Sequence, residues 1–295
     1  MANLKEVRTR IESVNSTKQI TSAMKMVASS KLRKSQNAII AMRPYAEKFG
    51  EIMAMAMSDQ KSDNVFSEIR TGGRILIVPL SSNKGLCGVF NANVIRNTIN
   101  LIHDDYQEYF DNNMIDIICI GSKVEEALKY KKYPVVANQN ALLDDVTYDN
   151  VLPFAEKLIK DFAEKKYDKI LFVYNQFKNA STQILVTEQF LPLTIKNSSD
   201  NIQKETNVET DFIFQPSKEI IFEEMLPRSL KMQVYKIILD SYTSEQGARM
   251  ISMTQATDNA TELIKELNLS YNKARQTTIT NEIVEIVSGA DALNG

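Results

Sequence analysis

Apolar residues recur at spacings of three and four along the first part of the chain. From residue 4 onward, the positions at this spacing are mostly apolar in two runs, which are Leu4, Val7, Ile11 and Val14, then Ala28, Leu32, Ser35, Ile39, Met42, Ala46, Phe49, Met53 and Ala56. This heptad spacing puts the side chains on one stripe of an α-helix and is typical of a coiled-coil seam. Pro44 and Gly50 are the helix breakers within residues 3–57. Because the seam continues beyond Pro44, we expect a kink there and a single helical segment over residues 1–57.

The seam positions between the two runs are polar. They fall on Lys18, Thr21 and Lys25, while apolar residues occur beside them at Ile20, Met24 and Val27. This displacement predicts a local phase shift, with the apolar face moving to the second set.

The last part of the chain has a second seam, within a helix expected over residues 225–288. Its members follow strict three-four spacing: Met250, Met253, Thr257, Ala260, Ile264, Leu267, Tyr271 and Ala274. At ~1.5 Å per residue the two helices would be roughly 80 and 95 Å long, so each needs a partner to be stable. We expect them to pair as one long antiparallel coiled coil.

The helix lengths also predict that the second helix extends about 9 residues, or ~14 Å, beyond the first. Its end carries apolar residues without an internal partner, namely Ile279, Ile283, Ile286 and Val287. An exposed apolar helix end of this kind indicates an external binding socket.

The middle of the chain, residues 70–215, has a different pattern. Short β-rich runs are expected at Arg74–Leu80, Ile115–Ile120, Lys169–Tyr174 and Gln183–Glu188. Amphipathic stretches lie between them, which favours a mainly parallel sheet covered by helices. The last two runs are eight residues apart and predict an antiparallel hairpin at one edge, followed by a polar loop at residues 197–211.

Composition supports long elements and few turns. The 295 residues include only 9 Gly and 7 Pro, and the two cysteines, Cys87 and Cys119, cannot form a disulfide framework. Residues 1–57 carry ten Lys or Arg and four Asp or Glu, although the whole chain has a formal charge of −2. A basic first segment on an acidic body suggests an acidic partner for that segment. No apolar run approaches the ~20 residues of a membrane span.

Candidate catalytic motifs are weak. Gly85 and Gly88 follow the first strand, but Lys84 precedes them, whereas a phosphate-binding P-loop has its lysine after the glycines. A tight strand-to-helix turn is the better interpretation. His103 is the one histidine and, on a helix, is expected at the surface. Cys87, His103 and Cys119 lack the close spacing of a structural zinc site. We therefore expect no catalytic, cofactor or metal site.

Two features of the first helix leave alternatives open. Its methionines, Met24, Met26, Met42, Met53, Met55 and Met57, form core packing or an adaptable contact surface. The cluster of Lys25, Lys31, Arg33 and Lys34 is either a solvated face or a contact for an acidic protein surface. Nucleic-acid binding is not expected, since no aromatic residues are interleaved with these cations.

Three stretches of the sequence resemble the gamma subunit of F-type ATP synthases. ITSAMKMVASSKLRKSQ (Ile20–Gln36) resembles its first signature, and SSNKGLCGVFN (Ser81–Asn91) the start of its middle domain. The long run from Ser244 to Leu293 resembles its C-terminal signature almost throughout. The resemblance implies a Rossmann-like middle domain, and a central rotor shaft that couples transmembrane ion flow to ATP synthesis inside an alpha3-beta3 ring. It also implies partners in the alpha, beta and epsilon subunits and the membrane c-ring.

The resemblance assigns contact roles residue by residue. Met24, with the adjacent Lys25, matches the first signature near an acidic beta-subunit loop, and Arg249 matches an arginine linked to coupling. Arg275, Gln276 and Thr280 match a motif that meets a beta-subunit catch loop, and Glu282 matches the acidic residue after it. Gly247 departs from the family by standing where Ala is common. No regulatory cysteine pair is inserted, so thiol switching is not expected.

Two other hypotheses remain from the sequence. The seams alone would suit a coiled-coil tether or scaffold without ATPase partners, and the middle segment alone would suit an α/β enzyme with helical arms. The shaft hypothesis implies a non-catalytic subunit. It also implies a peripheral protein on the cytoplasmic face of a bacterial inner membrane, because no transit-like N-terminus is present.

Overall fold

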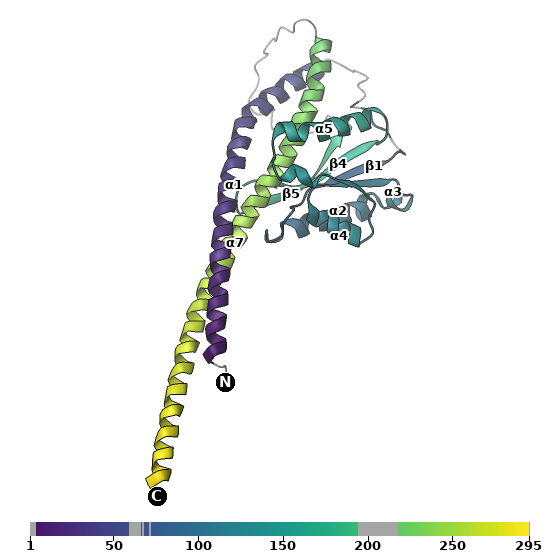
Figure 1. The fold of residues 1–295 in the computed structure, drawn as a ribbon. Helices are drawn as coiled ribbons and strands as arrows, with labels where there is room; N and C mark the ends of the chain where they lie inside the picture. Colours follow the sequence, from purple (N-terminus) through teal and green to yellow (C-terminus); the bar gives the residue numbers. More distant parts are fainter. Residues whose placement is uncertain (1–3, 59–65, 67, 71, 194–217, 295) are drawn as a thin grey trace. The chain divides into compact units, whose positions relative to one another are not determined.

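The computed structural model describes residues 4–58, 66, 68–70, 72–193 and 218–294, and it divides into two compact units. One unit contains residues 1–29 and 249–295, and the other contains residues 30–248. Two long helices, α1 (Leu4–Ser58) and α7 (Lys218–Asn294), each contribute to both units (Figure 1). As predicted, α1 continues through Pro44. The helix α7 begins earlier and ends later than the sequence predicted.

The larger unit is built on a five-stranded sheet of order β3-β2-β1-β4-β5, in which β5 alone is antiparallel to its neighbour. The strands are β1 (Ile75–Pro79), β2 (Ile115–Cys119), β3 (Val135–Asn138), β4 (Lys169–Phe177) and β5 (Gln183–Leu191). The connecting helices are α2 (Phe90–Asp105), α3 (Gln107–Asp111), α4 (Ser122–Tyr130), the 3-10 helix η1 (Asn140–Leu143) and α5 (Tyr148–Ala163). The mainly parallel sheet and its antiparallel edge hairpin confirm the sequence prediction.

The sequence missed β3, and one predicted loop is not covered. The strand β3 has four residues, half-buried and exposed in alternation, which is too short and too polar to stand out from a turn. The polar loop expected at residues 197–211 lies outside the described residues.

The two faces of the sheet carry separate apolar cores. Helices α2 and α4 cover one face, where Val94, Ile102 and Leu128 pack with Ile77 and Ile117. Helix α5 covers the other face together with the first half of α7. This split follows from strand alternation, since neighbouring residues of a strand point to opposite faces.

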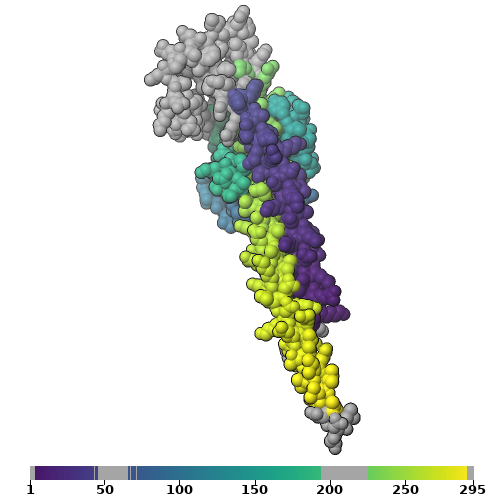
Figure 2. All heavy atoms as spheres, turned by 90° about the vertical axis from the view of Figure 1, so that its left-hand side faces the viewer, coloured from purple at the N-terminus to yellow at the C-terminus, as the bar shows by residue number. Residues whose placement is uncertain are grey.

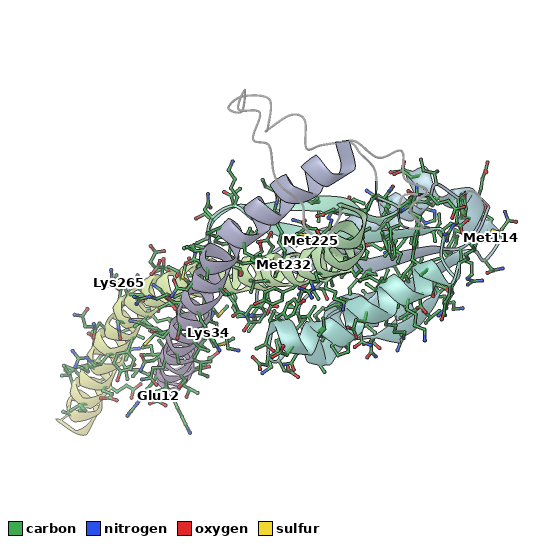
Figure 3. The ribbon with its side chains drawn as sticks, turned by 90° about the horizontal axis from the view of Figure 1, so that it is seen from above. Glu12, Lys34, Met114, Met225, Met232 and Lys265 are labelled. Atoms are coloured by element: carbon green, nitrogen blue, oxygen red, sulfur yellow. The ribbon has the colours of Figure 1, made fainter. Side chains whose placement is uncertain are left out.

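The first half of α7 belongs to the core of the sheet unit. Its buried residues repeat at helical spacing: Leu226, Leu230, Val234, Ile237 and Ile238. Met225, labelled in Figure 3, packs against the same cluster. Burial of five such side chains is worth about 10 kcal/mol as an upper estimate. The helix is therefore held to the sheet largely by apolar contact.

A polar contact adds specificity to this attachment. The Tyr174 hydroxyl donates to Glu188 Oε2 at 2.6 Å, and Gln233 Nε2 of α7 donates to Glu188 Oε1 at 2.7 Å. Burial, followed by the charge of Glu188, raises the pKa of Tyr174 well above its ordinary value. The hydroxyl thus stays a donor across the physiological pH range.

The smaller unit contains a coiled coil between the start of α1 and the part of α7 that begins at Arg249. Val7 and Ala28 of α1 are buried, as are Met253 and Ala260 of α7. The helices run antiparallel, because Thr21 Oγ1 and Thr257 Oγ1 lie 2.9 Å apart while both chain ends lie toward the same end of the unit (Figure 1).

The predicted phase shift in α1 is wrong at two of its three positions, Ile20 and Val27. Thr21 is buried, whereas Ile20 and Val27 are 61% and 57% exposed. The heptad seam therefore continues through the buried Thr21 while Ile20 and Val27 point outward, but at the next position Met24 is half-buried and Lys25 is exposed. The physical reason is that Thr21 has a hydroxyl partner on α7, so its burial carries little desolvation cost.

The overhang of α7 is longer than predicted. Thr21 faces Thr257, so Leu4 faces Ala274 and the helix continues to Asn294 without a partner from the described part of α1. That is about 20 residues, or ~30 Å, where the sequence had given about 9. Figure 2 shows the yellow end of α7 continuing past the start of α1.

Candidate functional site

The outward face of α1 in the coiled-coil unit combines apolar and basic side chains. Met24 is half-buried, Lys25 is exposed, and Met26 beside them is 67% exposed. With the exposed Ile20 and Val27, they give this turn of helix an apolar outer surface next to a cation. Single exposed apolar residues are ordinary, but several on adjacent turns mark a contact surface.

The basic cluster continues along α1 in the sheet unit. Lys31, Arg33 and Lys34 are exposed, and Lys34 is labelled in Figure 3. No ion pair within the described residues involves any of the three. Their exposure agrees with both interpretations, a solvated face or a contact for an acidic protein surface.

The methionines of α1 fit neither core packing alone nor a contact surface alone. Met24 and Met42 are half-buried and Met26 is exposed, so the stripe is neither all core nor all surface. The side chains of Met53, Met55 and Met57 lie outside the described set.

The overhang of α7 carries four of the predicted contact residues. Arg275, Gln276, Thr280 and Glu282 are all exposed, and the Thr280 hydroxyl donates to the Gln276 carbonyl at 2.9 Å. Apolar side chains between them are also exposed, by 46% to 71%: Ile279, Ile283, Val284, Ile286 and Val287. An isolated helix with this surface gains little from its own chain, so its apolar side chains are available for a surrounding partner.

The predicted residues form two regions, not one site. Met24 lies next to Thr21, which faces Thr257, so Arg275 lies about 20 residues, or ~30 Å, farther along α7. Arg249 differs from the others in being only 9% exposed. The Arg249 side chain is thus less accessible to a partner than the sequence suggested.

The carboxyl edge of the sheet is where open α/β sheets bind nucleotides. Here the loops after β1, β2 and β3 bind one another instead. Asn83 Nδ2 donates to the Asn140 carbonyl at 3.0 Å, and Asn140 Nδ2 donates to Glu125. Lys129, paired with Glu125 at 2.6 Å, lowers the pKa of that carboxyl, which keeps it charged in the network.

The N-terminus of α4 is occupied by the protein's own acceptors. Helix N-termini bind phosphates through free N–H groups. In this helix the Gly121 N–H donates to Asn140 Oδ1, Ser122 to Asn83 Oδ1, Lys123 to the Ser82 carbonyl and Val124 to Ser81 Oγ, over 2.9 to 3.2 Å. A phosphate would have to displace all four acceptors.

The turn after β1 presents two apolar side chains that the sequence did not single out. Leu86 is 63% exposed at φ +65°, and Val89 is 68% exposed. The turn is held by internal bonds, with Asn91 Oδ1 accepting from the Ser82 N–H at 2.9 Å and Ser82 Oγ donating to the Lys84 carbonyl at 2.7 Å. The backbone of Leu86 is held in an unfavourable conformation, and the turn exposes apolar side chains to solvent. Together these features indicate an interaction surface. The sequence signal was an apolar residue between glycines in a turn.

His103 lies at the surface, as expected. Its Nε2 lies 2.8 Å from the Tyr133 hydroxyl and its Nδ1 lies 2.6 Å from Gln107 Oε1. No group of three or more His, Cys, Asp or Glu in the described part of the chain is placed to hold a metal ion. None of the described helices is both long and apolar enough to cross a membrane.

Both cysteines are buried, and we expect neither to react in the folded protein. Burial raises the pKa of Cys119 to about 12, and the charge of Glu125 adds to the effect. Because the folded thiol holds its proton more tightly than the unfolded one, its share of stability is lost as the pH rises from about 9 towards 12.

Titration with a maleimide at pH 8 should modify Cys87 and Cys119 only after denaturant is added. One equivalent of rapid labelling without denaturant would contradict this.

Comparison with known proteins covers nearly the whole chain. A family model described as ATP synthase matches residues 3–293. The ATP synthase gamma chain of Christiangramia forsetii is 50% identical over 297 residues and 100% of both chains. The chain belongs to the ATP synthase gamma chain family.

Other members and solved structures agree with this assignment. The gamma chain of Flavobacterium psychrophilum is 50% identical and that of Chlorobaculum tepidum 37% identical, over 100% and 99% of both chains. A chain in a mitochondrial ATP synthase OSCP/F1/c-ring structure from Euglena gracilis has a TM-score of 0.68 at 22% identity, covering 98% of this gamma-family chain and 94% of its own length. That likeness supports the gamma-chain fold.

Proposed function

We propose that this gamma-family chain is the central shaft of an F-type ATP synthase, a subunit without a catalytic site of its own. The observation that carries the proposal is the full-length match to gamma chains at 50% identity. The geometry supports it, because α7 projects about 20 residues beyond its partner helix as an exposed helical rod. A rod of this kind can turn inside a surrounding ring.

The two contact regions then have separate roles. The apolar and basic outer face around Met24 and Lys25 suits an acidic loop at the lower part of a beta subunit. Arg275, Gln276, Thr280 and Glu282 suit a catch loop nearer the end of the shaft. Charged contacts that form and break as the shaft turns can favour one conformation of each beta subunit over another without adding net stability.

The sheet unit is the part of the chain to which the epsilon subunit and the membrane c-ring would bind. Its carboxyl edge is filled by its own side chains, which supports a binding role over a nucleotide-binding one. The exposed Leu86 and Val89 are a further candidate contact for the ring. Assembly through a c-ring would place the chain at the cytoplasmic face of a bacterial inner membrane.

Reconstitution tests the proposal. ATP hydrolysis by purified alpha and beta subunits should rise when this chain is added, and one copy should be present per three alpha-beta pairs. If the chain never joins the ring and assembles instead into a dimer of its own, the tether hypothesis replaces the shaft. Turnover by the isolated chain would support an enzyme.

The contact roles predict selective losses. Arg275→Ala combined with Gln276→Ala should lower the stimulated ATPase rate by about three- to tenfold, since it removes contacts of roughly 1 kcal/mol made by the overhang. Lys273→Ala is the matched control, because Lys273 is exposed on the same helix and carries the same charge but lies outside the matched motif. If Lys273→Ala lowers the ATPase rate equally, the loss comes from removing any positive charge and not from the matched contacts. Neither change should move the unfolding midpoint, because these side chains are exposed.

A further inference from the structure

The seam of the coiled-coil unit pairs residue by residue around Thr21 and Thr257. Their hydroxyl oxygens lie 2.9 Å apart, and Thr21 is 9% exposed. Since the helices are antiparallel, each step from Thr21 toward the start of α1 is matched by an equal step from Thr257 toward the end of α7. Val7 therefore faces Tyr271, and Ile11 faces Leu267. Every seam position from Leu4 to Ala28 has a seam position opposite it.

The apolar seam residues do not fix this register by themselves. Both seams repeat every seven residues, so a slip of α7 by seven again sets seam against seam. In one such slip Val7 would face Ile264 and Leu4 would face Leu267, which are more apolar neighbours than Tyr271 and Ala274. In the same slip Ile11 would face Ala260 and Val14 would face Thr257 in place of Leu267 and Ile264, so apolar contact is gained at two pairs and lost at two.

The threonine pair distinguishes the two registers. After that slip Thr21 would face Met250 and Thr257 would face Val14, so neither hydroxyl would have a polar partner across the seam. In the observed register Thr21 Oγ1 also lies 3.0 Å from the Lys18 carbonyl, and Thr257 Oγ1 lies 2.7 Å from the Met253 carbonyl. Each hydroxyl has one hydrogen, so one threonine donates across the seam while the other donates to its own helix.

We propose that Thr21 and Thr257 act as a register pin, positioning α7 along α1 by a hydrogen bond that no seven-residue slip can reproduce. A single polar pair in an apolar seam is the known means of specifying coiled-coil register at some cost in stability. The pin is a property of this chain and does not depend on the proposed function. Its consequence does, because a slip of one heptad would move Arg275 by ~10 Å along the shaft.

Disulfide trapping measures the register directly in the full chain. Ile11→Cys with Leu267→Cys reports the observed register, because these seam positions face each other. Ile11→Cys with Ala260→Cys reports the slip, since those positions are ~10 Å apart along the axis unless α7 moves. The disulfides are identified by peptide mass, which separates them from the buried Cys87 and Cys119.

We expect the parent chain to form the first disulfide and very little of the second. With Thr21→Val and Thr257→Val together, the slipped disulfide should form about tenfold faster, as the loss of one net hydrogen bond allows. Thr21→Ser with Thr257→Ser should behave as the parent, because the hydroxyls are kept. Either single valine change should have nearly the full effect, since one partner alone cannot make the bond.

Thr261→Val is the matched control, because its hydroxyl donates to the Thr257 carbonyl of its own helix, at 2.8 Å, and to no residue of α1 in the described part of the chain. It should leave the slipped disulfide at the parent level. The proposal is overturned if the double valine variant keeps the parent ratio of the two disulfides while its helix content is unchanged, or if Thr261→Val raises the slipped form equally. If the double variant does not fold, the single variants and the serine pair decide between these outcomes.

Discussion

Gly121→Ala should cost about 4 kcal/mol or more of folding stability, the largest single effect expected in this chain. Gly121 has φ +104° and ψ 132°, a backbone conformation that residues with a Cβ rarely adopt. An added Cβ would also lie 2.6 Å from the Ser81 carbonyl carbon and inside contact distance of its oxygen. The obstacle is the backbone of Ser81, just after strand β1. It cannot move aside without breaking the hydrogen bond from the Ser81 N–H to the Ile120 carbonyl, which is 2.8 Å long.

Urea unfolding followed by circular dichroism gives the measurement. Gly85→Ala is the matched control, because no atom lies within 4 Å of a Cβ added there and the change should stay within about 0.5 kcal/mol. A small loss at Gly121, similar to that at Gly85, would mean that the junction between β2 and α4 can relax. The network of Asn83, Asn140 and Glu125 would then be less rigid than described.

Arg74→Ala should lower stability by about 2 kcal/mol, the second largest effect. Arg74 holds Asp116 through Nη2 and through Nε at 3.2 Å, and the Tyr167 hydroxyl donates to the same carboxylate at 3.1 Å. Asp116 is 7% exposed in the strand β2, so removal of the guanidinium leaves a buried carboxylate with one donor. Breaking a buried pair costs about 3–5 kcal/mol, and we take a lower value because the Arg74 side chain is 47% exposed.

A double-mutant cycle with Tyr167→Phe separates the two contributions. Tyr167→Phe alone should cost about 1 kcal/mol, for one hydrogen bond to a charged group. The double change should cost more than the sum, because Asp116 then has no donor from either residue. Additive losses would show that the carboxylate finds other donors. Lys123→Ala, which breaks an exposed pair with Glu126 at 2.7 Å, is the surface control and should change stability by less than 0.5 kcal/mol.

The sequence predicted the candidate contact residues of α7 only by resemblance. Nothing in the pattern distinguished Arg275 or Gln276 from other polar residues of α7, and their exposure does not distinguish them either. The structure separates Arg249 from the rest by its burial. Leu86 and Val89 were recognised as a surface only from their exposure in the structure, because an apolar residue between glycines is equally typical of an ordinary turn.

Periodicity alone determined the two long helices, the mainly parallel sheet and the edge hairpin. These depend on local rules, in which apolar spacing selects helix or strand and a short connection selects an antiparallel neighbour. Tertiary structure decided which residues of α1 are buried around Thr21, because the preference for a buried threonine over Ile20 arises from Thr257, 236 residues away. It also decided the length of the overhang and the pairing of Arg74 with Asp116, whose residues are 42 positions apart. A sequence pattern gives the preference of each segment by itself, but burial of a polar group depends on whether a distant segment supplies its partner.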